Sequence, residues 1–119
     1  MSPLSLAIVI AVLAAVPAHA AEPLATCPAD LAAVDASFAE TQARLDKVTQ
    51  ADKVELCAAI KHHIEVMANG IAVFDRCMEN GHDKGENIAQ LEASIDDFLY
   101  INENQGCAPV TVPPSAAPQ

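Results

Sequence analysis

Aromatic residues are nearly absent from this chain. Of its 119 residues none is Trp, one is Tyr and three are Phe. A core without large rings has to be built from Leu, Ile, Val, Ala and Met, and a domain of this size buries only a modest apolar surface. We therefore expect covalent cross-links to supply much of its stability.

Basic residues are also scarce. Six Lys and Arg residues stand against sixteen Asp and Glu residues, which gives a formal net charge of −10. Nucleic acids and anionic membrane surfaces are both bound through basic surfaces, so the composition argues against either as a partner. A basic protein or a metal ion is the partner that this charge favours.

Charged side chains are missing from residues 1–20. Leu4–Val16 is a nearly unbroken apolar run of thirteen residues, and Pro17 and then Ala18-His19-Ala20 follow it. An apolar run, a breaker and small residues are typical of a cleaved secretory signal peptide, although no Lys or Arg precedes the run. The alternative is a retained membrane anchor, but thirteen helical residues span about 20 Å of a roughly 30 Å hydrocarbon core. We predict a signal peptide over residues 1–20 and a mature protein in the periplasm or outside the cell.

A lipoprotein signal is a second alternative, at Leu24-Ala25-Thr26-Cys27. Thr is a poor fit before the cysteine, and Glu22 and Pro23 separate this motif from the apolar run. Lipidation of Cys27 would also leave an odd number of cysteines in an oxidising compartment. We therefore expect Cys27 to form a disulfide instead.

A first helix is expected to begin at Pro28, the favoured first helical position, with Cys27 as its N-cap. Its apolar residues recur at spacings of three, four and seven, as on one face of a helix. They are Leu31, Val34, Phe38, Leu45 and Val48, with Thr41 at the remaining position of the stripe. Thr49 and Asp52 then form a capping pair that starts a second helix.

The second helix has the most regular pattern in the chain. Its apolar positions step alternately by three and four residues, as in helices that pack nearly parallel or antiparallel. They are Cys57, Ile60, Ile64, Met67, Ile71, Phe74 and Met78. Asn80-Gly81 is expected to end this helix.

A third helix is expected to open at the capping pair Asp83 and Glu86 and to end at Gly106. Its stripe consists of Ile88, Leu91, Ile95, Phe98 and Asn102. No stretch of the chain alternates apolar and polar residues at period two, which argues against strands. The predicted fold class is therefore all-α.

The four cysteines lie 30, 20 and 30 residues apart, at Cys27, Cys57, Cys77 and Cys107. This spacing lacks the CxxC of thioredoxin-like sites, the CxxCH of c-type haem attachment and the clustered ligands of zinc fingers. In an exported chain, two disulfides are the expected outcome.

Helical geometry selects one of the three possible pairings, because facing residues of an antiparallel helical hairpin are equidistant from its turn. The midpoints of Cys27–Cys77 and Cys57–Cys107 are residues 52 and 82, both at predicted turns. Cys57 and Cys77 would lie about 30 Å apart on one helix, whereas disulfide Cα atoms lie within roughly 7 Å. A Cys27–Cys57 bond would put a turn in the middle of the first helix. We predict Cys27–Cys77 and Cys57–Cys107.

These pairings predict an up-down-up three-helix bundle stapled by two disulfides. The stapled domain covers residues 21–107. Residues 108–119 are rich in Pro, Ala, Ser and Thr, and this composition predicts a disordered tail.

Two groups of residues could bind a metal ion. In the first, His62 is expected on the exposed side of the second helix and His63 beside its apolar seam. His63 and Met67 are four residues apart and share one edge, as would two ligands of a soft metal such as copper. The alternative is a solvated histidine beside an ordinary core methionine.

The second group lies at the turn before the third helix, where Glu79, His82, Asp83 and Glu86 crowd within eight residues. Carboxylates and an imidazole suit a divalent cation. The spacing lacks the alternating ligands of an EF-hand loop, and Asp83 and Glu86 have an alternative role as helix caps. We expect no other cofactor.

No catalytic constellation is evident in the sequence. All four cysteines are assigned to disulfides, a slim bundle leaves little room for a cleft, and no Gly-rich phosphate loop is present. We therefore expect no enzyme but a small acidic interaction module, such as an inhibitor, immunity protein, chaperone or stress factor. The alternative is a periplasmic metal-binding protein that uses one of the two groups above.

Overall fold

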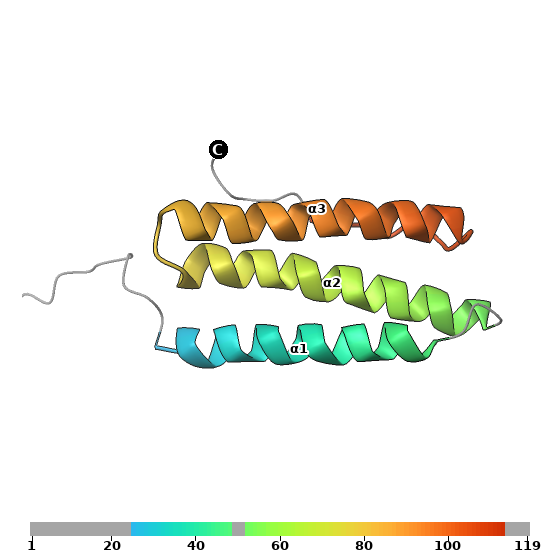
Figure 1. The fold of residues 1–119 in the computed structure, drawn as a ribbon, viewed down its shortest axis with the longest axis horizontal. Coiled ribbons are helices and arrows are strands. Elements are labelled where there is room, and N and C mark those ends of the chain that lie inside the picture. Colours follow the sequence, from blue (N-terminus) through green and yellow to red (C-terminus); the bar gives the residue numbers. More distant parts are fainter. Residues whose placement is uncertain (1–24, 49–51, 114–119) are drawn as a thin grey trace, which may run out of the picture.

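The computed structural model describes residues 25–48 and 52–113 and shows three α-helices in that part of the chain (Figure 1). α1 comprises Cys27–Lys47, α2 comprises Lys53–Cys77 and α3 comprises His82–Asn104. Consecutive helices run in opposite directions, and α1 and α3 pack on two different sides of α2. The all-helical fold predicted from the sequence is confirmed.

Several predictions fall outside the described residues. The signal peptide over residues 1–20 is one, and the turn at residues 49–51 and the last six residues are others. Within the described ranges, no helix is both long and apolar enough to cross a bilayer.

The first two helices begin close to the predicted positions. α1 starts at Cys27, one residue earlier than expected, and Pro28 lies in its first turn, where a missing N–H costs nothing. Asp52 caps α2, because its Oδ1 accepts a 3.0 Å hydrogen bond from the Glu55 backbone N–H. This bond satisfies one of the backbone donors that every helix leaves free at its start.

The prediction for the α2–α3 turn was partly wrong. α2 ends at Cys77, ahead of Asn80-Gly81, and α3 begins at His82 with Gly81 as its N-cap and no side-chain capping bond. Asp83 therefore lies inside the helix, two residues after the N-cap position. The Glu86 carboxylate instead lies 3.1 Å from His82 Nε2, on the next helical turn.

Both predicted disulfides are confirmed. Cys27–Cys77 and Cys57–Cys107 have Cα–Cα distances of 5.3 and 5.5 Å. The first joins the start of α1 to the end of α2, and the second joins the start of α2 to the chain just beyond α3. α2 is therefore tied covalently at each end to a different neighbour.

α2 is the central helix, and it buries two stripes rather than the single predicted seam. Ile60, Ile64 and Met67 of the predicted seam are buried. A second stripe, consisting of Leu56, Ala59, His63, Gly70 and Val73, is also buried. Because α1 and α3 pack against α2 from two sides, one row of apolar residues is too narrow to serve both contacts.

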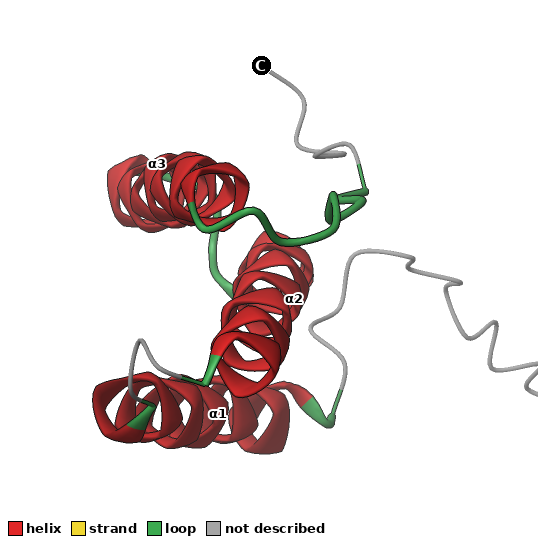
Figure 2. Cartoon of the chain, turned by 90° about the vertical axis from the view of Figure 1, so that its right-hand side faces the viewer, coloured by secondary structure: helices red, strands yellow, loops and turns green. Residues whose placement is uncertain are grey.

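The chain beyond α3 folds back over the helices. Gly106 adopts a positive φ of 71°, and the following residues leave the helix end and cross toward α2 (Figure 2). In residues 107–113, which we call the C-terminal strap, Val110 and Val112 are half-buried against the core. This differs from the disordered tail expected from Ala108 onward, because the Cys107 disulfide holds the strap beside α2.

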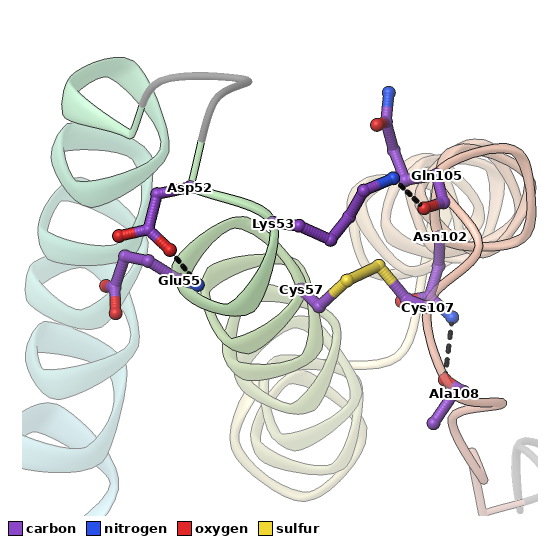
Figure 3. Close-up of a disulfide and its surroundings, with 8 residues drawn as sticks. All are labelled: Asp52, Lys53, Glu55, Cys57, Asn102, Gln105, Cys107 and Ala108. Atoms are coloured by element: carbon purple, nitrogen blue, oxygen red, sulfur yellow. Dashed lines mark hydrogen bonds between the residues drawn. A yellow bond between two sulfur atoms is a disulfide. The ribbon is translucent and has the colours of Figure 1, made fainter.

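Polar contacts around the Cys57–Cys107 disulfide hold the start of the strap (Figure 3). Lys53 Nζ donates a hydrogen bond to the Gln105 carbonyl at the end of α3. The Asn102 side-chain NH2 donates a 3.0 Å bond to the Ala108 carbonyl. A cation at a helix C-terminus also complements the negative end of the helix dipole.

Candidate functional site

The two adjacent histidines of α2 lie in different environments. His62 is exposed, as predicted, whereas only 6% of the His63 surface is accessible. His63 touches both flanking helices, because it is hydrogen-bonded to Thr41 of α1 and stacks edge-on against Phe98 of α3 with ring centroids 4.7 Å apart. The prediction that His63 lies beside the seam therefore underestimated its burial.

The Thr41–His63 hydrogen bond ties the ring to α1 through one of its two nitrogens. Thr41 Oγ1 lies 3.0 Å from the Ser37 carbonyl oxygen and 2.6 Å from His63 Nδ1. The tautomer of the imidazole determines whether the single hydroxyl proton of Thr41 is donated to Ser37 or to Nδ1.

Burial also keeps this imidazole neutral. Desolvation lowers the pKa of His63 below its usual value of 6.5, and the neighbouring charge of His62 lowers it further. An imidazolium ion at this position would lose its hydration without gaining an acidic partner. At neutral pH the ring is therefore uncharged.

An open surface hollow of about 350 Å³ lies against this ring. It is lined by Phe38, Ala39 and Gln42 of α1, His63 and Met67 of α2, and Leu91 of α3. Ala39 and Gln42 in this lining are exposed.

Gly70 lets side chains from both outer helices approach the backbone of α2. A methyl group at Gly70 would lie 2.8 Å from Phe38 Cζ and 3.3 Å from Leu91 Cδ1. The side chains of Phe38 and Leu91, which come from α1 and α3, therefore pack directly onto the backbone of α2.

The structure brings one of the two predicted metal groups together only in part. His63 and Met67 line the same hollow, but His62 is exposed outside that lining. At the α2–α3 turn, Glu79, His82, Asp83 and Glu86 are all exposed, and His82 pairs with Glu86. Among residues 25–48 and 52–113, no three His, Cys, Asp or Glu side chains converge as metal ligands would.

A second surface feature lies on α3. Ala93, Asp96, Asp97, Tyr100 and Glu103 are all exposed, and we call them the outer face of α3. The Tyr100 side chain is 67% exposed. The three acidic residues are three or four positions away from it and therefore surround its ring on the helix surface.

The basic residues are used elsewhere in the molecule. Arg44–Glu55 and Arg76–Asp30 join α1 to α2, and Lys84–Asp75 joins α2 to α3, at N–O distances of 2.8, 3.3 and 3.3 Å. In the described part of the chain, no Lys or Arg pairs with Asp96, Asp97 or Glu103. The outer face of α3 is therefore strongly negative.

Comparison with known proteins did not assign the chain to a family. No protein-family model matches it, and neither the characterised proteins nor the solved structures include a match.

The sequence interpretation missed Thr41 and Tyr100. Thr41 was taken only as a filler in the apolar stripe of the first helix. The midpoint of Thr41 and His63 is residue 52, the same turn position that selected Cys27–Cys77. The hairpin rule therefore contained the signal that these two polar residues face each other.

Proposed function

We propose that the protein is an exported, noncatalytic interaction module that binds a basic protein partner through the outer face of α3. The exposed ring of Tyr100 among Asp96, Asp97 and Glu103 is the observation that supports this most. Tyrosine is enriched at protein interfaces and can hold a cation over its ring, and nearby carboxylates accept charge-assisted hydrogen bonds.

The charge distribution also supports a basic partner. Three of the six basic side chains, those of Arg44, Arg76 and Lys84, are paired across helix junctions, and sixteen acidic residues give the chain a net charge of −10. A negative surface of this kind accelerates association with a positively charged protein and repels acidic ones.

Export and a noncatalytic role complete the proposal. The apolar segment near the amino terminus and the two disulfides both fit an oxidising compartment such as the periplasm. All four cysteines are in disulfides, so a thiol nucleophile is not available. Two cross-links hold α3 in place, and such preorganisation favours binding.

The test compares two variants of equal charge. Asp96→Asn, Asp97→Asn and Glu103→Gln together neutralise the outer face of α3. The control neutralises Asp35, Glu40 and Asp46, which are exposed on α1. Both variants and the parent protein are used to capture exported proteins of the source organism by cross-linking, at about 50 mM and about 300 mM salt.

We expect the parent and the α1 control to capture basic proteins at low salt. The α3 variant should not capture them. Tyr100 is the only tyrosine, so the NMR signals of its ring in isotope-labelled protein report directly on an unlabelled, purified partner. A partner captured equally by all three proteins, with unchanged Tyr100 ring signals, would contradict the proposed surface.

A further inference from the structure

We propose that Asn80 is a site of self-modification, at which the backbone nitrogen of Gly81 attacks the Asn80 side-chain amide and converts it to aspartate or isoaspartate. The site lies in the turn between α2 and α3 and consists of Asn80, Gly81 and Lys84. It is separate from the outer face of α3 and does not depend on the proposed function.

The chain contains the same dipeptide twice, in two different settings. Asn69-Gly70 lies within α2, and Gly70 is buried. A helical N–H is hydrogen-bonded to the carbonyl four residues earlier, so the Gly70 nitrogen is not available for attack. Asn80 and Gly81 lie between the two helices and are exposed. Within residues 52–113, the Gly81 N–H donates no backbone hydrogen bond.

Glycine at position 81 leaves the attacking nitrogen accessible. Gly81 has a φ of 156° and a ψ of −171°, a conformation that residues with a Cβ disfavour. A methyl group at this position would meet no atom within 4 Å. The space beside Gly81 is therefore open, and the residue has no side chain that would hinder attack by its nitrogen.

Lys84 activates the amide that is attacked. Its Nζ donates a 3.0 Å hydrogen bond to Asn80 Oδ1 and lies 3.3 Å from Asp75 Oδ1. The lysine side chain is only 15% exposed, so its ammonium group is held at the amide oxygen. Attack on Asn80 Cγ places a negative charge on this oxygen, and a positively charged donor that is already in position stabilises that charge.

The reaction needs no co-reactant except water. The Gly81 nitrogen forms a bond to Asn80 Cγ and loses its proton, the Cγ–Nδ2 bond breaks, and Nδ2 leaves as ammonia. Water then opens the resulting cyclic imide at either carbonyl group. Opening at Cγ gives aspartate, whereas opening at the backbone carbonyl gives isoaspartate, in which the chain runs through the former side chain.

The product is compatible with the place where it forms. Conversion replaces a neutral amide with a carboxylate and so adds one negative charge to the net charge of −10. The new carboxylate lies beside the Lys84 ammonium and one residue before the N-cap of α3, and the positive end of the helix dipole also favours it. We therefore expect the modified protein to stay folded and to accumulate as the exported molecule ages.

The experiment compares the two Asn-Gly pairs within one protein. The oxidised, folded protein and a reduced, alkylated and urea-unfolded sample are incubated at mildly alkaline pH, and portions taken over time are digested with trypsin. Cleavage after Lys61, Arg76 and Lys84 places the two pairs on separate peptides, residues 62–76 and 77–84. Mass spectrometry measures deamidation of each peptide, and an isoaspartate-specific methyltransferase identifies isoaspartate.

In the unfolded sample we expect both pairs to be converted at similar rates, because the dipeptide is the same. In the folded protein Asn80 should be converted at least about tenfold faster than Asn69. Lys84→Gln should slow the conversion of Asn80 in the folded protein at least about threefold and leave the rate in the unfolded sample unchanged. Lys61→Gln, at an exposed position of α2, should change neither rate.

Two outcomes would overturn the proposal. The first is conversion of Asn80 and Asn69 at equal rates in the folded protein, which would mean that the turn does not promote the reaction. The second is conversion of Asn80 in folded Lys84→Gln as fast as in the parent, which would exclude assistance by the lysine. If Lys84→Gln unfolds, Asn69 is converted at its unfolded rate, and the comparison of Asn80 with Asn69 in the parent remains decisive.

Discussion

The Thr41 hydroxyl lies 2.6 Å from Nδ1 of His63, inside the contact between α1 and α2. Thr41 is 2% exposed and His63 is 6% exposed, so this is a polar pair within an otherwise apolar interior. Thr41 in turn bonds back to its own helix at Ser37. The pair therefore connects the backbone of α1 to a side chain of α2 without the involvement of water.

Removal of one partner of the Thr41–His63 hydrogen bond should destabilise the protein more than removal of both partners. Thr41→Val leaves Nδ1 of His63 buried without its hydrogen-bond partner, and we expect the free energy of unfolding to fall by about 1–3 kcal/mol. Thr41→Val combined with His63→Phe should recover part of that loss, because neither polar group remains. Urea denaturation of the two single variants and the double variant measures the coupling. Strictly additive losses would show that the hydrogen bond contributes nothing.

The stability of the protein should fall in mild acid because of His63. Its folded-state pKa is below the usual 6.5, so the unfolded chain takes up a proton first as the pH falls. The contribution of His63 to the free energy of unfolding is therefore complete above about pH 6.5. It declines as the pH falls below this value and becomes constant below the folded-state pKa.

The parent and the Thr41→Val/His63→Phe variant should be compared by urea denaturation between about pH 7.5 and about pH 5.5. We expect the parent to lose more stability than the variant over this interval, and His62→Gln to reduce its loss only slightly. The carboxylates titrate in both proteins, so the difference isolates His63. If the parent and the variant lost equal stability over this interval, the pKa of His63 would not be lowered in the folded protein.

Two glycines should respond in opposite ways to the same substitution. Gly70→Ala places a methyl 2.8 Å from Phe38 Cζ, so the ring has to move and we expect a loss of about 1–3 kcal/mol. Gly85 in α3 has no atom within 4 Å of such a methyl, so Gly85→Ala should gain about 0.5–1 kcal/mol of helix propensity. Thermal unfolding of both variants measures the contrast, and a gain at Gly70 would mean that α1 and α3 can separate there.

Loss of the Cys57–Cys107 disulfide should release the C-terminal strap. Each disulfide closes a loop of 50 residues, which corresponds to about 4 kcal/mol in the chain-entropy description. We expect Cys57→Ala/Cys107→Ala to weaken the NMR contacts (NOEs) between the Val110 and Val112 methyl groups and the core. Cys27→Ala/Cys77→Ala should cost similar stability without that local effect. Unchanged NOEs in the Cys57→Ala/Cys107→Ala variant would mean that the valines hold the strap by packing alone.

The helices and the disulfides could be predicted because they depend on spacing along the chain. Apolar residues three and four apart mark a helix whatever its neighbours are, and the midpoints of the cysteine pairs locate the turns. The same rule would have paired Thr41 with His63, but a polar residue in an apolar stripe looks like an exception until its partner is known.

The strap and the hollow could not be predicted in this way. The composition of residues 108–113 indicates disorder, and only the distance from Cys107 to α2 explains why Val110 and Val112 are packed. The hollow beside His63 is lined by side chains from all three helices, and Phe38 and Leu91 in that lining also pack onto Gly70. Such a lining follows from the packing of three helices and not from the pattern of any one of them.

The two disulfides form overlapping loops, since Cys57 lies inside the loop closed by Cys27–Cys77 and Cys77 lies inside the loop closed by Cys57–Cys107. A peptide bond cut anywhere between Cys27 and Cys107 therefore leaves the two fragments joined by at least one bridge. A protease that nicks an exposed turn would produce a clipped molecule that stays in one piece until it is reduced. In a compartment that contains proteases, this topology allows the protein to tolerate a first cleavage without losing either half.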